Sequence, residues 1–339
     1  MNKALKLITF LVIMGHLANA QQRPQYTQYV FNNYLLNPAL SGIENYTDIK
    51  AGYRSQWTGL DGAPVTSYLT ANMPIGNNFL GDNAGTMPGG GGENPMSRSY
   101  VRDYTAAAPH HGVGITIVND KAGPITQTNI NATYAYHIGL SPKWNMSVGV
   151  SAGISDIGLN TANITLEDPN DRAITNGIAN QLKPDLGAGI WIYTSNFYVG
   201  ASAQQLLKQN LYFSTNTSTY NQSQTVPHFF FTAGVKLPIS DDVSFMPSAM
   251  LKVIKPVPVS YDITGKLAFR DKFWIGGSYR HNDSFSALAG LFISSLISVG
   301  YSYDVTTSNL NTVSNGTHEI VIGILLNNRY KVTCPMRTF

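Results

Sequence analysis

The chain alternates apolar and polar residues with a period of two. In the segment Asn145–Ser155, which reads NMSVGVSAGIS, apolar side chains occupy every second position and Asn, Ser or Gly occupy the positions between. A period of two places the two sets on opposite faces of a β-strand. About ten residues is also the length of a tilted transmembrane β-strand. The pattern therefore predicts a strand with one face in lipid and the other in a polar lumen.

The same alternation recurs along the chain, for example at Ile130–Ile138, Ile297–Val305 and Ile320–Leu326. The predicted strands begin near Ile49, Val65, Gly112, Ile125, Trp144, Asp185, Phe197, His228, Val243, Val259, Phe273, Ser284, Leu296 and Thr317. About fourteen strands is an even number, as in bacterial single-chain barrels. A secreted β-sandwich also alternates, but so many ten-residue strands favour a barrel. We predict an all-β fold, an antiparallel transmembrane β-barrel with an N-terminal plug or periplasmic segment.

The lengths of the predicted connections also alternate. Connections after even-numbered strands are short, whereas Ile157–Pro184 and Leu206–Pro227, which follow odd-numbered strands, are long. Outer-membrane barrels have short periplasmic turns and longer outside loops, so we expect both termini to be periplasmic. The connection Asn77–His111 departs from this rule, because it is a long Gly- and Pro-rich segment on the periplasmic side. Pro247 lies inside a predicted strand, and we expect a bulge there.

The first twenty residues are typical of a secretory signal peptide. Lys3 and Lys6 precede the apolar run Leu7–Met14, and Ala18–Ala20 fits the small-x-small cleavage rule. Export without a transmembrane helix suits the outer membrane of a Gram-negative bacterium. The predicted organisation is a signal peptide at 1–20, a periplasmic or plug segment at 21–48, a barrel at 49–327 and a periplasmic tail at 328–339.

The composition narrows the class of protein further. Only 12% of the 339 residues are charged, the net charge is +3, and Lys and Arg are scattered, which argues against a nucleic-acid surface. A mean hydropathy of -0.08 excludes a helical membrane protein. A single cysteine, Cys334, excludes an internal disulfide framework. These exclusions are consistent with a barrel whose outer surface contacts the lipid of the outer membrane.

The sequence shows no motif typical of catalysis, a cofactor or a metal. His110 and His111 lie in a predicted loop without a third ligand at metal spacing, so we interpret them as solvated. The acidic run Glu167–Asp171 lacks the EF-hand spacing and is interpreted as a solvated turn. Gly89–Gly92 is not followed by Lys-Ser/Thr, so it is not a phosphate loop. We predict a non-enzymatic protein with no metal and no cofactor.

The polar faces of the strands predict a lumen of mixed charge. A charge on the lipid face costs roughly 2–4 kcal/mol at the midplane, so charged residues should point inward. By the alternation, the inward set is Lys50, Arg54, Gln56, Lys236, Lys252, Lys266, Arg280, Asp120, Asp304 and Glu319. They either line a water-filled lumen or hold a plug or a partner peptide. The segment Gln21–Tyr46, too apolar for a free tail, is the candidate plug; packing beneath the barrel is the alternative.

Short motifs follow one another along the chain: NPALSG at Asn37–Gly42, GYRSQW at Gly52–Trp57, GVGI at Gly112–Ile115, NDKAG at Asn119–Gly123, YAYH at Tyr134–His137, DKFWIG at Asp271–Gly276, GYSYD at Gly300–Asp304 and HEI at His318–Ile320. In this order they resemble the PorP/SprF family of type IX secretion system membrane proteins. The resemblance covers nearly the whole mature chain. The segment Asn77–His111 is longer than the family's usual connection.

The resemblance implies an outer-membrane component of the type IX secretion system, with roles in protein secretion, gliding motility and adhesin anchoring. Its partners would be other components of that system and a secreted adhesin-like substrate with a C-terminal sorting domain. The family has no accepted catalytic residues. From the loop composition, we expect Tyr212, Phe213, Tyr220 and Asn221 to contact the partner, because aromatic and amide side chains suit interfaces. The alternative function is an outer-membrane channel for small or apolar solutes.

Overall fold

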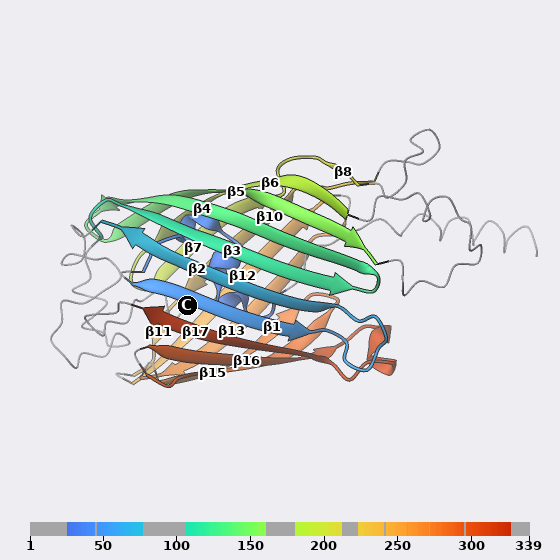
Figure 1. The fold of residues 1–339 in the computed structure, drawn as a ribbon. Helices are drawn as coiled ribbons and strands as arrows, with labels where there is room; N and C mark the ends of the chain where they lie inside the picture. The colour runs from blue at the N-terminus through green and yellow to red at the C-terminus, as the bar shows by residue number, and fades with distance from the viewer. Residues whose placement is uncertain are drawn as a thin grey trace, which may run out of the picture.

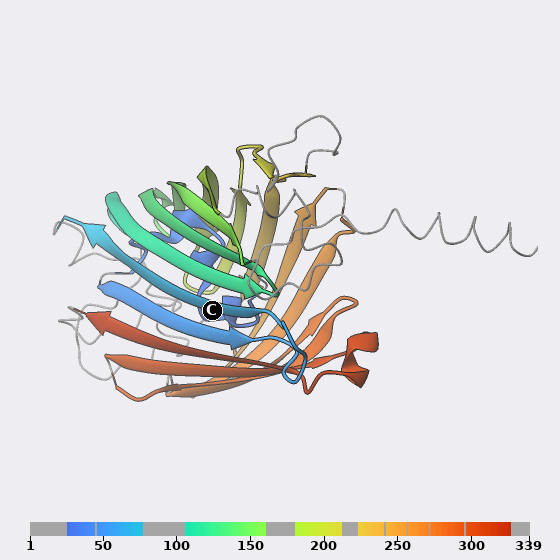
Figure 2. The same ribbon diagram turned by 45° about the vertical axis from the view of Figure 1, so that its right-hand side comes forward.

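The protein is a closed antiparallel β-barrel of 14 strands with its N-terminal segment inside (Figures 1 and 2). The computed structural model describes residues 26–44, 46–76, 106–160, 180–211, 223–240, 242–255, 257–270, 272–294 and 296–326. Within these residues, no helix is long and apolar enough to cross a membrane. The fold predicted from the alternating pattern is confirmed.

Each barrel strand pairs with the next one along the chain, and pairing of β1 with β17 closes the barrel. The strands are β1 Thr47–Ser55, β2 Val65–Ile75, β3 His110–Ala122, β4 Ile125–Ser141, β5 Trp144–Leu159, β6 Asn180–Tyr193, β7 Phe197–Gln204, β10 His228–Val235, β12 Val243–Ile254, β13 Ser260–Phe269, β14 Phe273–Arg280, β15 Ser284–Phe292, β16 Ile297–Thr306 and β17 Thr317–Leu326. Short strands are β8 Asn210–Leu211, β9 Ser223–Gln224 and β11 Leu237–Pro238; 3-10 turns are η1 Gln28–Val30, η2 Asn33–Leu35, η3 Pro38–Leu40 and η5 Asn309–Thr312.

Strand β17 illustrates how the sequence sets the two faces of the wall. Ile320, Ile322 and Ile324 are exposed on the outside, whereas the alternate residues Glu319 and Val321 are buried. Apolar residues thus cover the face that meets lipid, and polar or small residues face the lumen.

Two local features differ from the sequence prediction. Strand β6 begins at Asn180 and not at Asp185, so Pro184 pairs with Ile154 inside the wall and the long connection is shorter. The bulge expected at Pro247 was wrong, because the register between β12 and β13 is constant across this residue. On its opposite edge, β12 pairs with β10 as far as Ser248 and with β11 from Phe245, in the same register. The ladder is interrupted around Pro247, because proline lacks an amide donor.

The two ends of the barrel differ in their connections. At the short-turn end, tight turns join β4 to β5, β6 to β7, β13 to β14 and β15 to β16. At the long-loop end, residues 160–179 join β5 to β6, and the connection carrying β8 and β9 joins β7 to β10 (Figure 1). Strand β1 begins and β17 ends at the short-turn end. The connection between β2 and β3 is also at this end, and its residues 77–105 lie outside the described residues.

The described part of the N-terminal segment, Tyr26–Glu44, lies in the lumen and is here called the plug (Figure 2). Tyr26 is at the long-loop end, where Arg280 Nη2 donates to its carbonyl oxygen at 3.4 Å. Gly42 is at the short-turn end, in close contact with the backbone of Pro74 and Gly112. The plug therefore runs lengthwise through the barrel, and this part of the chain does not pack beneath it.

Candidate functional site: the filled lumen

A buried ion cluster joins the start of the plug to the barrel wall. Arg54 Nη2 on β1 donates to Asp304 Oδ2 on β16 at 2.9 Å. Its Nη1 donates to Glu319 Oε2 on β17 at 2.9 Å. Thr27 of the plug accepts from Arg54 at 2.8 Å, and its hydroxyl donates to Asp304 at 2.6 Å. The backbone amides of Thr27 and Gln28 both donate to Glu319, at 2.8 and 3.2 Å.

The cluster places two anions and one cation where almost no water reaches. The exposed fractions of Arg54, Asp304 and Glu319 are 1%, 2% and 1%. Buried charges persist only where partners and hydrogen bonds replace the lost hydration. The short charge-assisted bonds among Arg54, Asp304, Glu319 and Thr27 replace much of it, while Arg54 Nε and Asp304 Oδ1 make no hydrogen bond within the described residues. The cluster thus ties Thr27 of the plug to residues of β16 and β17 that are 277 and 292 positions away in sequence.

A second ionic group lies at the long-loop end. Arg280 on β14 donates to Asp262 on β13 at 3.0 Å and to Asp283 in the following turn at 3.2 Å, in addition to the carbonyl of Tyr26. This group binds Tyr26 at the start of the plug, and the Arg54 cluster binds Thr27, the next residue.

The lysines that were predicted to face the lumen are also on the inner side. Lys236, Lys252 and Lys266 are buried, and Lys50 is half-buried and paired with Asp48. Lys50 Nζ lies 5.5 Å from the ring centroid of Phe31 in the plug. Of the residues predicted to point inward, Lys50, Arg54, Arg280 and Asp304 contact the plug.

The NPALSG turn is held through its backbone by side chains of the wall. Ser147 Oγ donates to the carbonyl of Ala39 at 2.7 Å, and His137 Nε2 lies 2.8 Å from the carbonyl of Ser41. Within the turn, the Asn37 side chain accepts from the Ala39 amide at 3.0 Å and donates to the wall carbonyl of Ile190 at 3.0 Å. The turn is thus capped locally and bound to β5, β4 and β6.

His110 has a different role from the one predicted. It opens strand β3 and is buried, with its ring stacked on His137 at a centroid distance of 4.5 Å. Its Nε2 lies 3.2 Å from the carbonyl of Gly42. The interpretation as a solvated loop histidine was wrong, because the strand begins two residues earlier than expected. His111, the next residue, points outward and bonds to the Tyr134 hydroxyl at 2.7 Å.

Two glycines of the wall allow the plug backbone to approach closely. A Cβ atom at Gly149 would lie 2.5 Å from the Ala39 amide nitrogen, and one at Gly112 would collide with the carbonyl of Ser41. Any larger residue at these positions would push the NPALSG turn away from the wall.

Inward aromatic rings complete the socket around the plug. Each lies over a glycine directly opposite on the adjacent strand; the pairs are Tyr68 with Gly52, Trp191 with Gly200, Tyr198 with Gly234, and Trp274 with Gly290. Tyr68 packs edge-on against Tyr26 at 5.4 Å, and Trp274 lies 6.0 Å from Phe31. Because each ring lies over a glycine of the wall, the rings give the plug an apolar contact surface inside an otherwise polar lumen.

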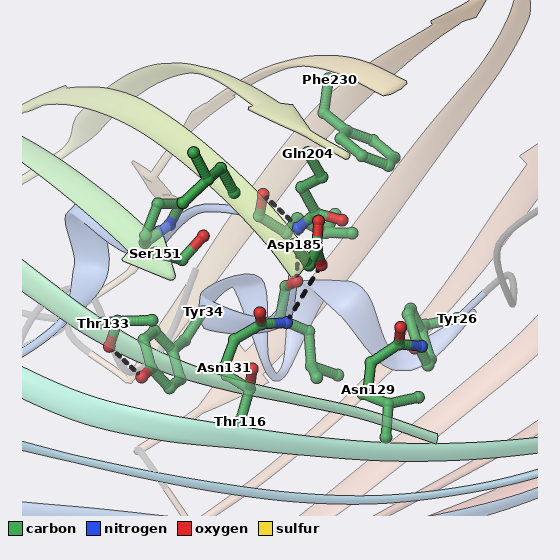
Figure 3. A pocket seen from close by; sticks show the side chains of 15 residues that line it. Tyr26, Tyr34, Thr116, Asn129, Asn131, Thr133, Ser151, Asp185, Gln204 and Phe230 are labelled. Carbon is green, nitrogen blue, oxygen red and sulfur yellow. Dashed lines mark hydrogen bonds between the residues drawn. The ribbon is translucent and has the colours of Figure 1, made fainter. Parts of the chain in front are cut away.

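Small voids remain between the plug and the wall. One, shown in Figure 3, is lined by Asn131, Ser151 and Asp185 of the wall and by Tyr26 and Leu36 of the plug. Another is lined by Asp48 and Lys50 of β1 and by Phe31 of the plug. A third lies beside Arg280, Asp262 and Lys252.

Some predicted sites lie outside the described residues. These are the partner-binding candidates Tyr212, Phe213, Tyr220 and Asn221, the acidic run Glu167–Asp171 and the glycine run Gly89–Gly92. In the part of the chain that is described, no group of three or more His, Cys, Asp or Glu could hold a metal ion.

Sequence reasoning missed how the short motifs converge. Arg54 belongs to GYRSQW, Asp304 to GYSYD and Glu319 to HEI, and they meet in one ion cluster. His137 of YAYH binds the NPALSG turn in the same lumen. The signal that could have indicated this convergence is that each motif places a charged or polar residue on the inward face of its strand.

Comparisons with known proteins identify a family and several solved structures to which the chain is similar. The family model described as "Type IX secretion system membrane protein PorP/SprF" matches residues 18–324. No curated protein matches the chain. The outer membrane protein Omp33 of Acinetobacter baumannii is 9% identical with a TM-score of 0.46, covering 84% of this chain and 100% of its own. A FadL homologue from Pseudomonas aeruginosa is 10% identical with a TM-score of 0.47, covering 91% of this chain and 96% of its own.

Proposed function

Since the chain belongs to the PorP/SprF family and is an outer-membrane β-barrel component of the type IX secretion system, we propose that it assists a secreted substrate. The substrate is an adhesin-like protein with a C-terminal sorting domain, and the assistance is secretion, surface anchoring or both. The role is non-enzymatic. The observation that supports it is the filled lumen: a plug bound at Thr27 by a buried ion cluster suits a docking component better than a diffusion channel.

We also propose an orientation of the barrel in the membrane. The short-turn end, with the end of β17 at Leu326, faces the periplasm, and the long-loop end faces outward, following the loop-length rule of outer-membrane barrels. The C-terminal tail 328–339 is then periplasmic, where other components of the secretion system can reach it. The N-terminus was expected on the same side. Tyr26, the first described residue, lies at the long-loop end, and the residues before it are outside the described part of the chain.

The substrate contacts the barrel at the long-loop end. Tyr212, Phe213, Tyr220 and Asn221 lie between β8 and β9, in the longest outside connection after β7. Loops can be shortened without loss of the barrel, because the ladder hydrogen bonds lie in the strands.

The test measures where the substrate is found. In a strain that lacks the protein, we expect the substrate in the medium or retained inside, and no longer on the surface. Deletion of Thr215–Gln222 should release it while the barrel still assembles. Wild-type surface retention in that strain and in one lacking Leu166–Gly177 would contradict anchoring by these loops. Normal retention with lost uptake of a small solute would favour the alternative channel function.

A further inference from the structure

Strand β6 is longer than its neighbour β7 and leaves part of one edge without a partner strand. All of β6, Asn180–Tyr193, pairs with β5, whereas β7 pairs with β6 only from Ala188 onward. In the described part of the chain, a single hydrogen bond reaches this edge along residues 180–187, from the Leu206 amide to the Leu186 carbonyl at 3.0 Å. The wall therefore has a step at the long-loop end, where roughly 25 Å of strand edge is open.

The chain that follows β7 turns away from this edge. Gln205 has a φ of 53°, in the left-handed region that residues other than glycine seldom adopt. After the bond from Leu206, the chain continues into β8 and β9, which among the described residues pair only with each other, as a separate two-stranded sheet (Figure 1). The connection from β7 to β10 therefore does not extend the wall beside β6.

The open edge presents main-chain groups in the order of a β-ladder. Because alternate residues of a strand direct their amide and carbonyl to opposite sides, the bond to Leu186 shows that the even-numbered residues face the open side. Asn180 and Leu182 each offer an amide and a carbonyl there, and Pro184 offers a carbonyl alone. The ligand that matches such a row of donors and acceptors is another extended strand.

The outer face of the wall beside this edge is polar, which places the edge outside the hydrocarbon. Asp156 of β5 lies two residues beyond the exposed Ile154, on the same outer face, and pairs with Leu182. On its other side Asp156 pairs with Thr128 of β4, which accepts from Asn119 Nδ2 of β3 at 2.7 Å. Neither a charged residue nor an unpaired strand edge is stable in lipid. The edge is thus open to water and to a second polypeptide.

The side chains that flank the edge differ between the two faces of the wall. On the outer face, Leu182 has an exposed fraction of 64%, the largest among the described large apolar side chains, and Leu186 is also exposed. On the inner face, Gln181 and Asp185 are buried polar residues. Side chains directly opposite on neighbouring strands lie about 4.5–5.5 Å apart and interact. A strand that fits here therefore alternates, with apolar residues on its outer face and polar residues on its inner face.

We propose that the open edge of β6 binds a strand of the secreted partner, which extends the wall beyond the end of β7. This inference rests on the proposed function, because the long-loop end must face outward for the partner to reach it. The edge is continuous with the connection from β7 to β10, to which substrate contact is assigned. A second copy of the chain is a different occupant: antiparallel pairing of two identical edges needs barrels of opposite orientation, whereas copies inserted in one membrane share one orientation.

The first experiment removes main-chain donors from the open edge. It measures surface retention of the polypeptide that a strain lacking the protein releases. Leu182→Pro and Asn180→Pro each delete one amide that faces the open side, and Pro184 shows that β6 accepts proline in this orientation. The control is Ser308→Pro, between β16 and β17, where a φ of -79° suits proline. Retention should fall on the order of tenfold when both edge substitutions are combined, and should be unchanged in the control.

Heat-modifiable migration on gels shows whether each variant barrel assembles. Loss of retention in an assembled edge variant, with normal retention in the control, supports the site. Wild-type retention in the assembled edge variants overturns it, and the proposed function then stands if the strain lacking the protein still releases the substrate. Normal retention in that strain instead removes the proposed function itself. If the edge variants do not assemble, the second experiment, which leaves the main chain unchanged, decides.

The second experiment identifies the occupant. A photo-crosslinking p-benzoylphenylalanine at position 182, in the otherwise full-length protein in living cells, should join the barrel to the same released polypeptide, within a segment of alternating apolar and polar residues that mass spectrometry maps. The same group at position 263, where Ile263 is 55% exposed on the lipid face of β13, should not. Crosslinks to a second copy, only to this chain's own residues, or to no polypeptide overturn the inference.

Discussion

Replacing Arg54 by leucine removes the guanidinium that holds Asp304, Glu319 and Thr27 together. Both carboxylates would then lie within the lumen without their cation, and the hydroxyl of Thr27 would lose a donor. Removing one partner of a buried pair typically costs about 3–5 kcal/mol. We expect Arg54→Leu to reduce the free energy of unfolding by an amount in that range and to loosen the start of the plug. Insertion into the membrane should persist, because the change lies on the inner face.

Urea unfolding of the purified protein in detergent, followed by tryptophan fluorescence, measures this effect. The matched control is Arg270→Leu, which removes an arginine paired with Asp242 on an exposed turn. Exposed pairs contribute little, so the control should unfold as the wild type does. Limited proteolysis near Thr27 reports whether the plug has loosened.

A triple variant separates charge from packing. Adding Asp304→Asn and Glu319→Gln to Arg54→Leu removes the two uncompensated anions, and replacing a whole buried ionic group is often neutral. We expect the triple variant to recover most of the lost stability. If Arg54→Leu and Arg270→Leu unfold at the same urea concentration, the ion cluster does not hold the plug and the reasoning is refuted.

Three further expectations concern the wall and the orientation. Ile322→Arg, on the lipid face of β17, should lower membrane stability by roughly 2–4 kcal/mol in a refolding assay, whereas Ile322→Leu should not; equal effects would reverse the assignment of faces. Gly149→Ala should destabilise the protein by about 1–3 kcal/mol in urea, because the new methyl group meets the NPALSG turn, whereas Gly277→Ala, with nothing nearer than 3.8 Å, should unfold like the wild type. Protease added to intact cells should cut within 160–179 and spare 77–105; cutting confined to the latter would invert the orientation.

The strand pattern could be predicted from the sequence because it depends on a local rule. Every second residue is apolar over Met146–Ile154 in β5 and over Ile320–Leu326 in β17, as expected for strands with one face in lipid. The rule fails where loop signals override it. Pro184 and the residues before it read as a loop, but they pair within β6, since a register fixed by many neighbours tolerates one missing donor.

The lumen could be predicted only in part. The inward direction of Arg54 and Asp304 follows from alternation, yet their contact depends on closure of the barrel, which brings β16 and β1 to either side of β17. The burial of His110 depends on where β3 begins and on the position of the plug, which periodicity does not report. Contacts between residues some 250 positions apart are not encoded in any window of the sequence.

Electrical conductance is the most direct test of a lumen closed by its own N-terminal segment. The wild-type protein is reconstituted in a planar lipid bilayer, and current is recorded under applied voltage. With Tyr26–Glu44 fixed inside the barrel, we expect no stable stepwise openings, whereas Arg54→Leu should show intermittent ones. Stable porin-like openings of the wild-type protein would contradict a closed lumen and would favour a channel for small solutes.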